Sequence, residues 1–397
     1  MPAGDLLIVG LDASAIAASA SSSGHNVYAA DYFGDRDTQS VTQMNYSLAH
    51  QVPGRSCGRV LEHFSPAGLV RLARRLVHEY CIEGILLGSG LEDSPEELKA
   101  LEGLAPILGN PVDVISKVRD RVSFFDTLAK RRIRCPETIQ AEDAKEAEEA
   151  ARELGYPVVV KPIHGFGGAD VKYIRDSKAL QSVIRSEEEV LVQKYIRGIA
   201  ASASVVGTGK ESAVLMVNEQ ILGVRQFGAS GRFTYCGNIV PLVVSRSALK
   251  RCQSISAEVS NTFGLVGSNG VDFVLDEFGL PWVVEVNPRF QGTIECVEKV
   301  LGINLVEAHL AACSGRLTDL PKVSPRFSAR LVLYGRQRCS VPDLSVFTEV
   351  RDIPFYGVIV EKGEPVCSVV TEGKTKTQCI GNAKGLAKQV YVLLAPE

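Results

Sequence analysis

Two kinds of hydrophobic pattern follow one another along this chain, and their order is the strongest constraint on its fold. In the first third, short apolar runs such as 6–9 and 84–87 alternate with helical stretches such as 69–80. Alternation of this kind favours a parallel sheet flanked by helices. Beyond the predicted helix that ends at Gly155, the chain becomes strand-rich, and the turn pattern at 207–209 indicates an antiparallel hairpin. We therefore expect α/β architecture followed by α+β architecture.

The composition excludes several classes of protein. A formal net charge of −3 gives no electrostatic basis for binding nucleic acid or an anionic membrane. No apolar stretch approaches the ~20 residues that a transmembrane helix needs, and the start of the chain lacks the basic region of a signal peptide. The ten cysteines form no C-x-x-C pair, which favours neither a zinc site nor a disulfide framework. We expect a cytoplasmic location, where thiols stay reduced.

Polar side chains alternate along the segment 283–289. If this segment is a strand, Glu285, Asn287 and Arg289 project from one face. Burying such groups without partners is costly, whereas Mg²⁺ prefers carboxylate and carbonyl oxygens, and arginine binds phosphate. Asp272, on the preceding predicted strand, could supply a second carboxylate. The alternative is a surface hairpin with an incidental salt bridge.

A second segment joins a buried strand to a glycine-rich loop. The apolar run 158–160 ends at Lys161 and continues into the loop 165–169. Glycines let backbone N–H groups approach phosphate oxygens, and the lysine adds positive charge. No G-K-[ST] follows, so this is not a Walker A loop. Taken alone, the segment is equally well explained as a flexible turn with a solvated lysine.

Two further segments carry weaker signals. The strand 190–192 leads into an aromatic-containing stretch, 193–198, whose backbone could meet an adenine edge; a plain strand and loop is the simpler explanation. A charged helix is expected over 114–131, and the basic residues of 116–122 could reach a triphosphate. The alternative there is a solvated face over an apolar stripe.

Two familiar nucleotide motifs are absent. The stretch 207–212 resembles the end of a P-loop, but the required first glycine and the final Ser or Thr are missing. The first predicted strand is followed by 10–14, which lacks G-x-G-x-x-G, although Asp31 lies where a dinucleotide-binding fold keeps its ribose carboxylate. A dinucleotide-dependent oxidoreductase is therefore not expected.

Taken in chain order, these segments resemble the ATP-grasp superfamily. The order is a basic helix, a V-V-K-P strand with a glycine-rich loop, V-Q-x-Y-I-x-G, and a D-F…E-V-N-P-R hairpin, within roughly 114–310. The resemblance implies an ATP-grasp fold with four parts: a Rossmann-like N-terminal domain (1–112), a small lid subdomain (113–200), a large subdomain with the metal site (201–320) and a small C-terminal α+β unit (326–397).

The resemblance also implies roles for individual residues. It assigns phosphate and nucleotide contacts, a flexible loop, an adenine pocket and a site for one or two Mg²⁺ (or Mn²⁺) ions. The phosphate-side residues are Arg121, Lys161, Gly165, Gly167 and Gly168; the adenine-side residues are Gln193, Lys194, Tyr195 and Ile196; the metal ligands are Asp272, Glu285 and Asn287; and the catalytic residues are Arg289 and Lys161.

One position departs from the family pattern. Ile199 follows Gly198, where the family usually has an acid that binds ribose, so Glu188 or Glu189 could serve instead and the assignment stays open. His164 is expected to be an ordinary loop residue. The resemblance implies an acceptor pocket built from the N-terminal domain and loops such as 228–237. Arg225, Arg232 and Tyr235 would suit a carboxylate-bearing substrate, although an ordinary solvated loop is an equal alternative.

The implied activity is ligation driven by ATP. A carboxylate is activated as an acyl phosphate and attacked by an amine or a similar nucleophile, so the expected partners are small molecules, without nucleic acid or membrane, and a homodimer is a possibility. The segments 27–38, 351–354 and 363–366 are similar to predicted carboligases of methanogenic archaea and methylotrophic bacteria, which suggests C1-cofactor biosynthesis. The alternatives are a biotin-carboxylase-like carboxylase and a non-catalytic ATP-binding regulatory protein.

Overall fold

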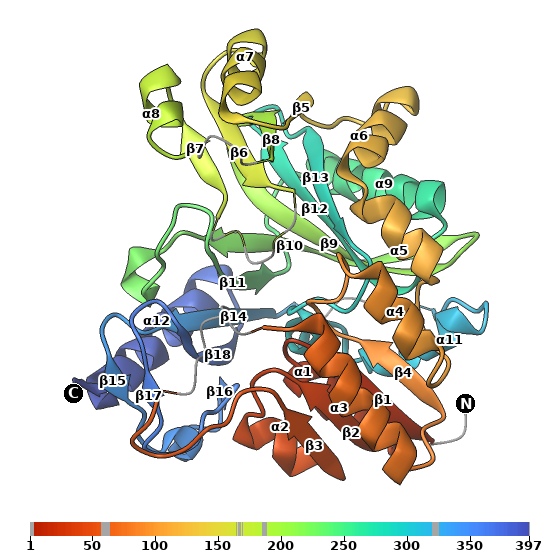
Figure 1. Cartoon of the computed structure of the whole chain (residues 1–397), viewed down its shortest axis with the longest axis vertical. Coiled ribbons are helices and arrows are strands. Elements are labelled where there is room, and N and C mark those ends of the chain that lie inside the picture. The colour runs from red at the N-terminus through yellow and green to blue at the C-terminus, as the bar shows by residue number, and fades with distance from the viewer. Residues whose placement is uncertain are drawn as a thin grey trace.

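The structure is a computed structural model of the chain (Figure 1). Its described residues are 4–56, 64–163, 165, 168, 170–184, 189–319 and 325–396. Gly167, His164 and Glu188 therefore lie outside the described residues, as does most of the expected linker at 321–325.

The N-terminal part is a four-stranded parallel sheet in the order β3-β2-β1-β4. Its strands are β1 (Asp5–Gly10), β2 (Asn26–Asp31), β3 (Met44–Ser47) and β4 (Gly84–Leu87), and its helices are α1 (Ser14–Ser22), α2 (Arg36–Val41), α3 (Pro66–Glu79) and α4 (Pro95–Glu102). Along β1, Leu7 and Val9 pack in the cluster that includes α3, while Leu6 and Ile8 pack in the cluster that includes α1. Both faces are covered, which explains the continuous apolar runs. The chain passes from β1 to β2 and β3 on one side and then crosses back to β4 on the other side of β1, so a crevice opens beyond the carboxyl ends of β1 and β4.

The single helix expected over 114–131 is wrong. The chain forms α5 (Val112–Arg119) and α6 (Arg121–Lys130), and Asp120 between them has an extended backbone. The Asp120 carboxylate accepts a hydrogen bond from Ser123 N at 3.1 Å, so it acts as the N-cap of α6, a role that aspartate favours over a helix interior. The break places a basic residue on each side of the cap.

A second four-stranded sheet, in the order β5-β8-β6-β7, is antiparallel and lies at the top of Figure 1. Its elements are β5 (Thr138–Ala141), α7 (Ala144–Leu154), β6 (Val158–Pro162), β7 (Lys172–Ile174), α8 (Ser177–Gln181) and β8 (Val190–Lys194). The alanine face of α7 packs on the buried valines of β6 and β8. Lys161 and Gln193 lie at the ends of these two strands, as the sequence indicates.

An eight-stranded antiparallel sheet forms the centre of the molecule, in the order β13-β12-β9-β10-β11-β14-β18-β16. Its strands are β9 (Gly198–Thr208), β10 (Ser212–Leu222), β11 (Tyr235–Val240), β12 (Val266–Asp276), β13 (Pro281–Asn287), β14 (Phe327–Tyr334), β16 (Val350–Arg351) and β18 (Pro365–Gly373). Helix α9 (Arg246–Phe263) covers the apolar face at the β13 end.

The C-terminal part shares this central sheet through β14, β16 and β18. Its remaining elements are a three-stranded sheet of β15 (Cys339–Ser340), β17 (Ile359–Val360) and β19 (Ala395–Pro396), together with α12 (Lys376–Leu393). Helices α10 (Ile294–Leu301) and α11 (Leu305–Cys313) connect β13 to this part. The four domain boundaries stay a prediction. No helix within the described residues combines the length and the hydropathy needed to cross a bilayer.

A buried polar joint fastens the N-terminal part to the central sheet. Asn110 Nδ2 donates to Asn269 Oδ1 at 2.6 Å and to the carbonyl of Pro288 at 3.0 Å, while its Oδ1 accepts from Val266 N at 2.8 Å. Pro288 stands between Asn287 and Arg289. The joint therefore fixes the backbone of the segment that carries the predicted metal and phosphate ligands.

His309 of α11 completes this joint. Its Nδ1 accepts a hydrogen bond from Ser268 N at 2.7 Å, and its Nε2 lies 2.8 Å from the carbonyl oxygen of Leu108. Burial lowers the pKa of His309 to about 4, against a smaller upward contribution from the Leu108 carbonyl. The imidazole is thus neutral in the folded protein at neutral pH.

We predict that His309 makes the folded protein sensitive to mild acid. The unfolded imidazole has a pKa of about 6.5, so between that pH and about 4 the unfolded chain binds a proton that the folded chain does not. Stability contributed by His309 is full above pH 6.5 and is lost as the pH falls toward 4, with a slope of up to about 1.4 kcal/mol per pH unit. Urea midpoints at pH 7.5, 6 and 5 measure this, and His309→Asn should show a flatter profile. Parallel profiles would contradict the prediction.

Candidate functional site

A cleft of about 1440 Å³ lies between the three main sheets. The residues of the sequence prediction that line it are Lys161, Gly165, Gly168, Gln193, Lys194, Tyr195, Ile196, Asp272, Glu285, Asn287 and Arg289. Arg121 is not part of the lining but contacts Glu285. A smaller hollow of about 450 Å³, lined by Arg131, Glu258, Asn261 and Thr262, contains none of them. The structure therefore gathers segments that are far apart in the sequence around one space.

A row of polar side chains crosses the central sheet on the face toward the cleft. Residues directly opposite in paired strands share a face, and so do residues two apart along a strand. The row runs Glu285, Asp272, Ser202, Asn218 and then, two residues further along β10, Gln220, Asn238 and Arg330. On the opposite face Ala201, Ala203 and Val271 pack in the core below α9. Buried polar groups on one face of a sheet are costly unless they are paired or bind a ligand.

Asp272 lies next to Glu285 near one end of this row, and one of its carboxylate oxygens has no hydrogen-bond partner among the described residues. Its Oδ2 accepts from Asn287 Nδ2 at 3.1 Å, whereas its buried Oδ1 has no hydrogen-bond partner among the described residues. Burial and then the negative charge of Glu285 raise the pKa of Asp272 to about 7, against the opposing effects of Gln220 and Arg289. A cation beside Oδ1 would satisfy this oxygen and favour its charge.

Glu285 has the opposite electrostatic environment. Burial disfavours its charge, but Arg121 and Arg119 outweigh burial and hold the pKa of Glu285 at about 2. Its Oε1 accepts from Arg119 Nη1 and from Arg121 Nη2, each at 2.9 Å. The side chain of Arg119 is only 7% exposed. The two arginines that flank the cap of α6 thus converge on one carboxylate oxygen.

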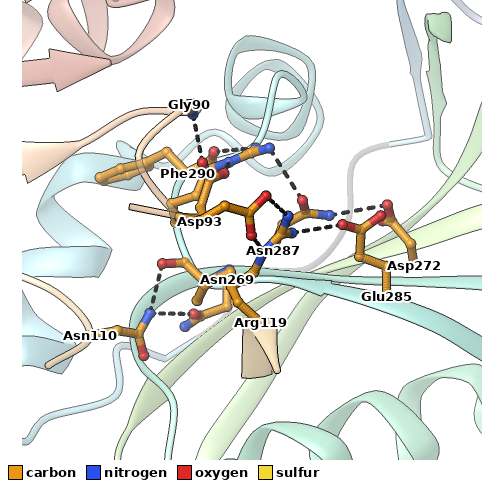
Figure 2. Close-up of polar contacts among 12 residues, drawn as sticks. Gly90, Asp93, Asn110, Arg119, Asn269, Asp272, Glu285, Asn287 and Phe290 are labelled. Carbon is orange, nitrogen blue, oxygen red and sulfur yellow. Dashed lines mark hydrogen bonds and ion pairs between the residues drawn. The ribbon is translucent and has the colours of Figure 1, made fainter. Parts of the chain in front are cut away.

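The loop after β4 supplies two further acids that sequence reasoning missed (Figure 2). Asp93 accepts from Arg119 through both oxygens, with Oδ1 2.5 Å from Nε and Oδ2 2.6 Å from Nη2. Glu92 Oε1 accepts from Arg289 Nε at 2.6 Å, and its Oε2 accepts from Gly90 N at 2.6 Å. The signal that could have found them is their place, since loops at the carboxyl end of a parallel strand line ligand crevices.

The donor set at this end of the cleft fits Mg²⁺. Asp272, Glu285 and Asn287 bring two carboxylates and an amide together on adjacent strands, beside the unsatisfied Asp272 Oδ1. Mg²⁺ takes one or two carboxylates and completes its shell with water and phosphate oxygens. Within the described residues there is no cluster of three or more His, Cys, Asp or Glu suited to a metal ion. The site therefore fits an ion that is coordinated jointly by the protein and by nucleotide phosphates better than an ion coordinated by protein ligands alone.

Lys161 lies at the end of β6, facing the two carboxylates. Burial lowers the pKa of Lys161 to about 8, while Glu285 and Asp272 raise it and Arg121 lowers it. A nearby phosphate would raise the pKa of Lys161 and favour its charged form further. Gly168, in the loop beyond, has φ +69°, and a Cβ there would meet the carbonyl oxygen of Phe233 at 2.4 Å. That glycine is thus required by close packing, in addition to any contact with phosphate.

Tyr195 and Arg232 line the cleft near the β5-β8-β6-β7 sheet, and Tyr173 packs against both. The rings of Tyr173 and Tyr195 meet edge to face at 4.9 Å, and Arg232 lies 4.2 Å above Tyr173 and donates from Nη2 to Tyr195 Oη at 3.1 Å. Gln193 is buried and donates from Nε2 to Thr138 Oγ1 at 2.8 Å. Its side chain is therefore engaged. The backbone N–H groups of Lys194 and Tyr195 also donate, to the carbonyls of Glu137 at 2.9 Å and Pro157 at 3.3 Å. The adenine contact stays a prediction.

Two other predicted positions lie apart from the cleft. Glu189 is a hydrogen-bond acceptor of Gln140 in an exposed contact and is not among the lining residues. Arg225 is exposed on a short 3₁₀ turn, whereas Arg232 and Tyr235 line the cleft. The ribose contact and the acceptor residues stay predictions.

At the N-terminal end the cleft reaches a charged crevice built from β1, β14 and the loop near β16. Arg330 Nη2 lies 2.5 Å from Asp352 Oδ2 and 3.6 Å from Asp12 Oδ2. Ser14 Oγ lies 2.7 Å from carboxylate oxygens of both Asp12 and Asp352. Asp352 holds a positive φ of 56°, a conformation that Asp tolerates better than most residues. Two acids therefore face one arginine at this end.

Comparison with known proteins gives a consistent family signal. A family model described as an ATP-grasp domain matches residues 118–293. An uncharacterized protein of Methanocaldococcus jannaschii is 24% identical over 372 residues, covering 94% of this chain and 89% of that one. The chain spans 24% of the carbamoyl phosphate synthase large chain of Clostridium acetobutylicum, at 24% identity over 258 residues.

Two solved structures share the fold over nearly the whole chain. One is the biotin carboxylase domain of Hydrogenobacter thermophilus 2-oxoglutarate carboxylase in complex with MgADP, ADP and bicarbonate, with a TM-score of 0.75, 15% identity and coverage of 99% of this chain and 90% of that one. The other is an L-amino acid ligase from Bacillus licheniformis, with a TM-score of 0.71, 16% identity and 99% coverage of both chains. At these identities the likeness shows the fold.

We predict that Asp352 is needed to keep Arg330 buried. Removing one partner of a buried ion pair leaves the other charge uncompensated, so Asp352→Ala should destabilise the protein by about 3 kcal/mol. Thermal and urea unfolding measure the loss. Asp343→Ala, which breaks the exposed pair with Arg36, is the control and should change stability much less. Equal losses in the two variants would contradict this assignment.

Proposed function

We propose that this protein, whose residues 118–293 form an ATP-grasp domain, is an ATP- and Mg²⁺-dependent ligase that activates a carboxylate as an acyl phosphate. The observation that carries the proposal is the meeting of Asp272 and Glu285 with Lys161 and Arg289 in one cleft, with Asp272 Oδ1 buried and unsatisfied. Such an arrangement binds a polyphosphate and a cation together.

Asp272, Glu285 and Asn287 would hold the metal ion. When bound, the ion neutralises charge on the phosphates. Lys161 supplies positive charge from β6, and the backbone N–H groups of Gly165 and Gly168 would contact phosphate oxygens. The chain after Gln193 would receive the adenine, with the Tyr195 ring as part of the wall. These roles follow the position of each residue along the cleft.

The reaction would proceed in two displacements. A substrate carboxylate oxygen attacks the γ-phosphorus of ATP, forming a P–O bond and releasing ADP. The nucleophile then attacks the acyl carbon, and inorganic phosphate leaves with the C–O bonding electrons. Arg289, oriented by Glu92, would neutralise the transferred phosphoryl group, and positioning would supply much of the rate.

An amine is the nucleophile that best fits the N-terminal crevice. Asp12 and Asp352 give this end two carboxylates against the single guanidinium of Arg330. Burial, followed by the negative charge of Asp352, raises the pKa of Asp12. Asp12 is partly open to the cleft, so it can bind an ammonium group and accept its proton before attack. The fold shared with an L-amino acid ligase supports formation of a C–N bond.

A carboxylase-like reaction is the second candidate. The fold shared with a biotin carboxylase domain in complex with MgADP and bicarbonate supports it. ADP release that requires bicarbonate and no organic acid would favour this reading. If ADP is released above background without any acid, amine or bicarbonate, the result favours neither the ligase nor the carboxylase. If no ADP is released under any condition, the result favours a regulatory nucleotide-binding protein.

The cellular setting is a further part of the proposal. All nine cysteines within the described residues are free thiols, which supports a reducing, cytoplasmic location. A place in C1-cofactor biosynthesis is a prediction from the segments 27–38, 351–354 and 363–366.

We predict that Glu285→Gln abolishes ATP turnover while leaving the fold intact. The amide keeps the shape of the side chain but removes the charge that a divalent cation needs, so the loss should exceed the roughly 10–100-fold typical of an outer-shell partner. ADP release with Mg²⁺ as the metal is the measurement. Glu277→Gln, in the exposed turn between β12 and β13, is the matched control and should keep wild-type turnover. Near-normal ADP release by the Glu285 variant would sink the site assignment.

We predict that Asp12→Asn separates activation from ligation. The variant should still release ADP with the acid substrate and hydroxylamine, which captures an acyl phosphate, but its ligation to an amine should fall at least about 100-fold. In the wild type, ligation should decline as the pH falls through the raised pKa of Asp12, because the protonated acid cannot accept the amine's proton. Equal losses in both assays would contradict a role for Asp12 toward the nucleophile.

A further inference from the structure

The loop after β4 places two acids of the N-terminal part against two arginines of the candidate ATP site. Asp93 engages Arg119 through both carboxylate oxygens, at 2.5 and 2.6 Å. Glu92 engages Arg289 at 2.6 Å, and both of these side chains are at least four-fifths buried. Such short, two-point or buried contacts fix the orientation of a guanidinium. The loop thus determines where both arginines point.

Each of these arginines also contacts a proposed metal ligand. Arg119 Nη1 donates to Glu285 Oε1 at 2.9 Å, and Arg289 Nη2 donates to Asn287 Oδ1 at 3.2 Å. The result is two chains of contacts, Asp93–Arg119–Glu285 and Glu92–Arg289–Asn287. Figure 2 shows the first of them. Each proposed ligand oxygen is therefore shared with an arginine that an N-terminal acid restrains from its other side.

The contacts of the Arg119 guanidinium show the effect of its pairing with Asp93. Two of its three nitrogens are committed to Asp93, so Nη1 alone reaches Glu285. Without the Asp93 charge, the guanidinium would be free to pair with Glu285 through two nitrogens. It would also carry an uncompensated positive charge beside the ligand. Both effects oppose a divalent cation, whereas the second attracts a polyphosphate.

We propose that Asp93 and Glu92 are positioning residues that limit Arg119 and Arg289 to a single hydrogen bond each with Glu285 and Asn287 and so set the affinity of the site for its divalent cation. This rests on the proposed function, which assigns Glu285 and Asn287 to the metal. The two acids lie in the loop after β4, which also lines the cleft. The N-terminal part thereby contributes to metal binding without supplying a ligand.

Binding of a non-hydrolysable ATP analogue, AMP-PNP, tests this without relying on turnover. Calorimetric titration in EDTA gives the metal-free affinity, and a Mg²⁺ titration of the preformed complex gives the cation affinity. Asp93→Asn should weaken Mg²⁺ about 10–100-fold, as expected for an outer-shell partner, while leaving metal-free AMP-PNP unchanged or tighter. Asp93→Glu should restore most of the Mg²⁺ affinity. Glu96→Gln, an exposed charge loss on α4, is the control and should change neither.

A double variant separates positioning from general damage. In an Arg119→Met background, Asp93→Asn should have little further effect on Mg²⁺, because its effect acts through Arg119. Glu92→Gln tests the second chain in the same way should the Asp93 variant fold poorly. Equal weakening of Mg²⁺ and metal-free AMP-PNP, or unchanged Mg²⁺ affinity, would overturn the inference. Failure of the wild-type protein to bind AMP-PNP at all would instead overturn the proposed function.

Discussion

The arrangement of this protein depends on charged side chains that meet across the boundary between its N-terminal sheet and its central sheet. Arg119 stands at the centre, with Asp93 on one side and Glu285 on the other. Arginines this deeply buried are stable only with partners on more than one side. The partners come from segments nearly two hundred residues apart in the chain. Correct packing of the two sheets is thus a condition for the candidate site to exist.

The row of polar side chains on the central sheet also depends on how the sheet is packed. One face of β12 and β9 carries Asp272 and Ser202, each with a buried oxygen atom that lacks a partner among the described residues. The opposite face carries small and branched apolar side chains under α9. Hydrophobic burial on the apolar face offsets the free-energy cost of these unpartnered buried oxygen atoms. Because alternate residues of a strand point to opposite faces, the residues of the candidate site lie on one face of the sheet and the stabilising apolar residues lie on the other.

Much of the architecture followed from local pattern. The apolar run 84–87 coincides with β4, and the strands expected around Lys161, Gln193 and Glu285 are present. The helix over 114–131 was wrong, because the capping bond of Asp120 competes with a continuous helix. Glu92 and Asp93 carried no motif, since their importance comes from the side chains that the fold places opposite them.

By itself, the sequence determined which residues could serve an ATP site, because strand period and glycine spacing are local properties that survive in any context. The tertiary structure alone decided the pKa values of those residues and the side chains with which they form hydrogen bonds. Neither the raised pKa of Asp272 nor the depressed pKa of Glu285 can be read from their neighbours in the chain. Burial and the distance to charges on other elements set both values, and these are established only when the sheets pack together.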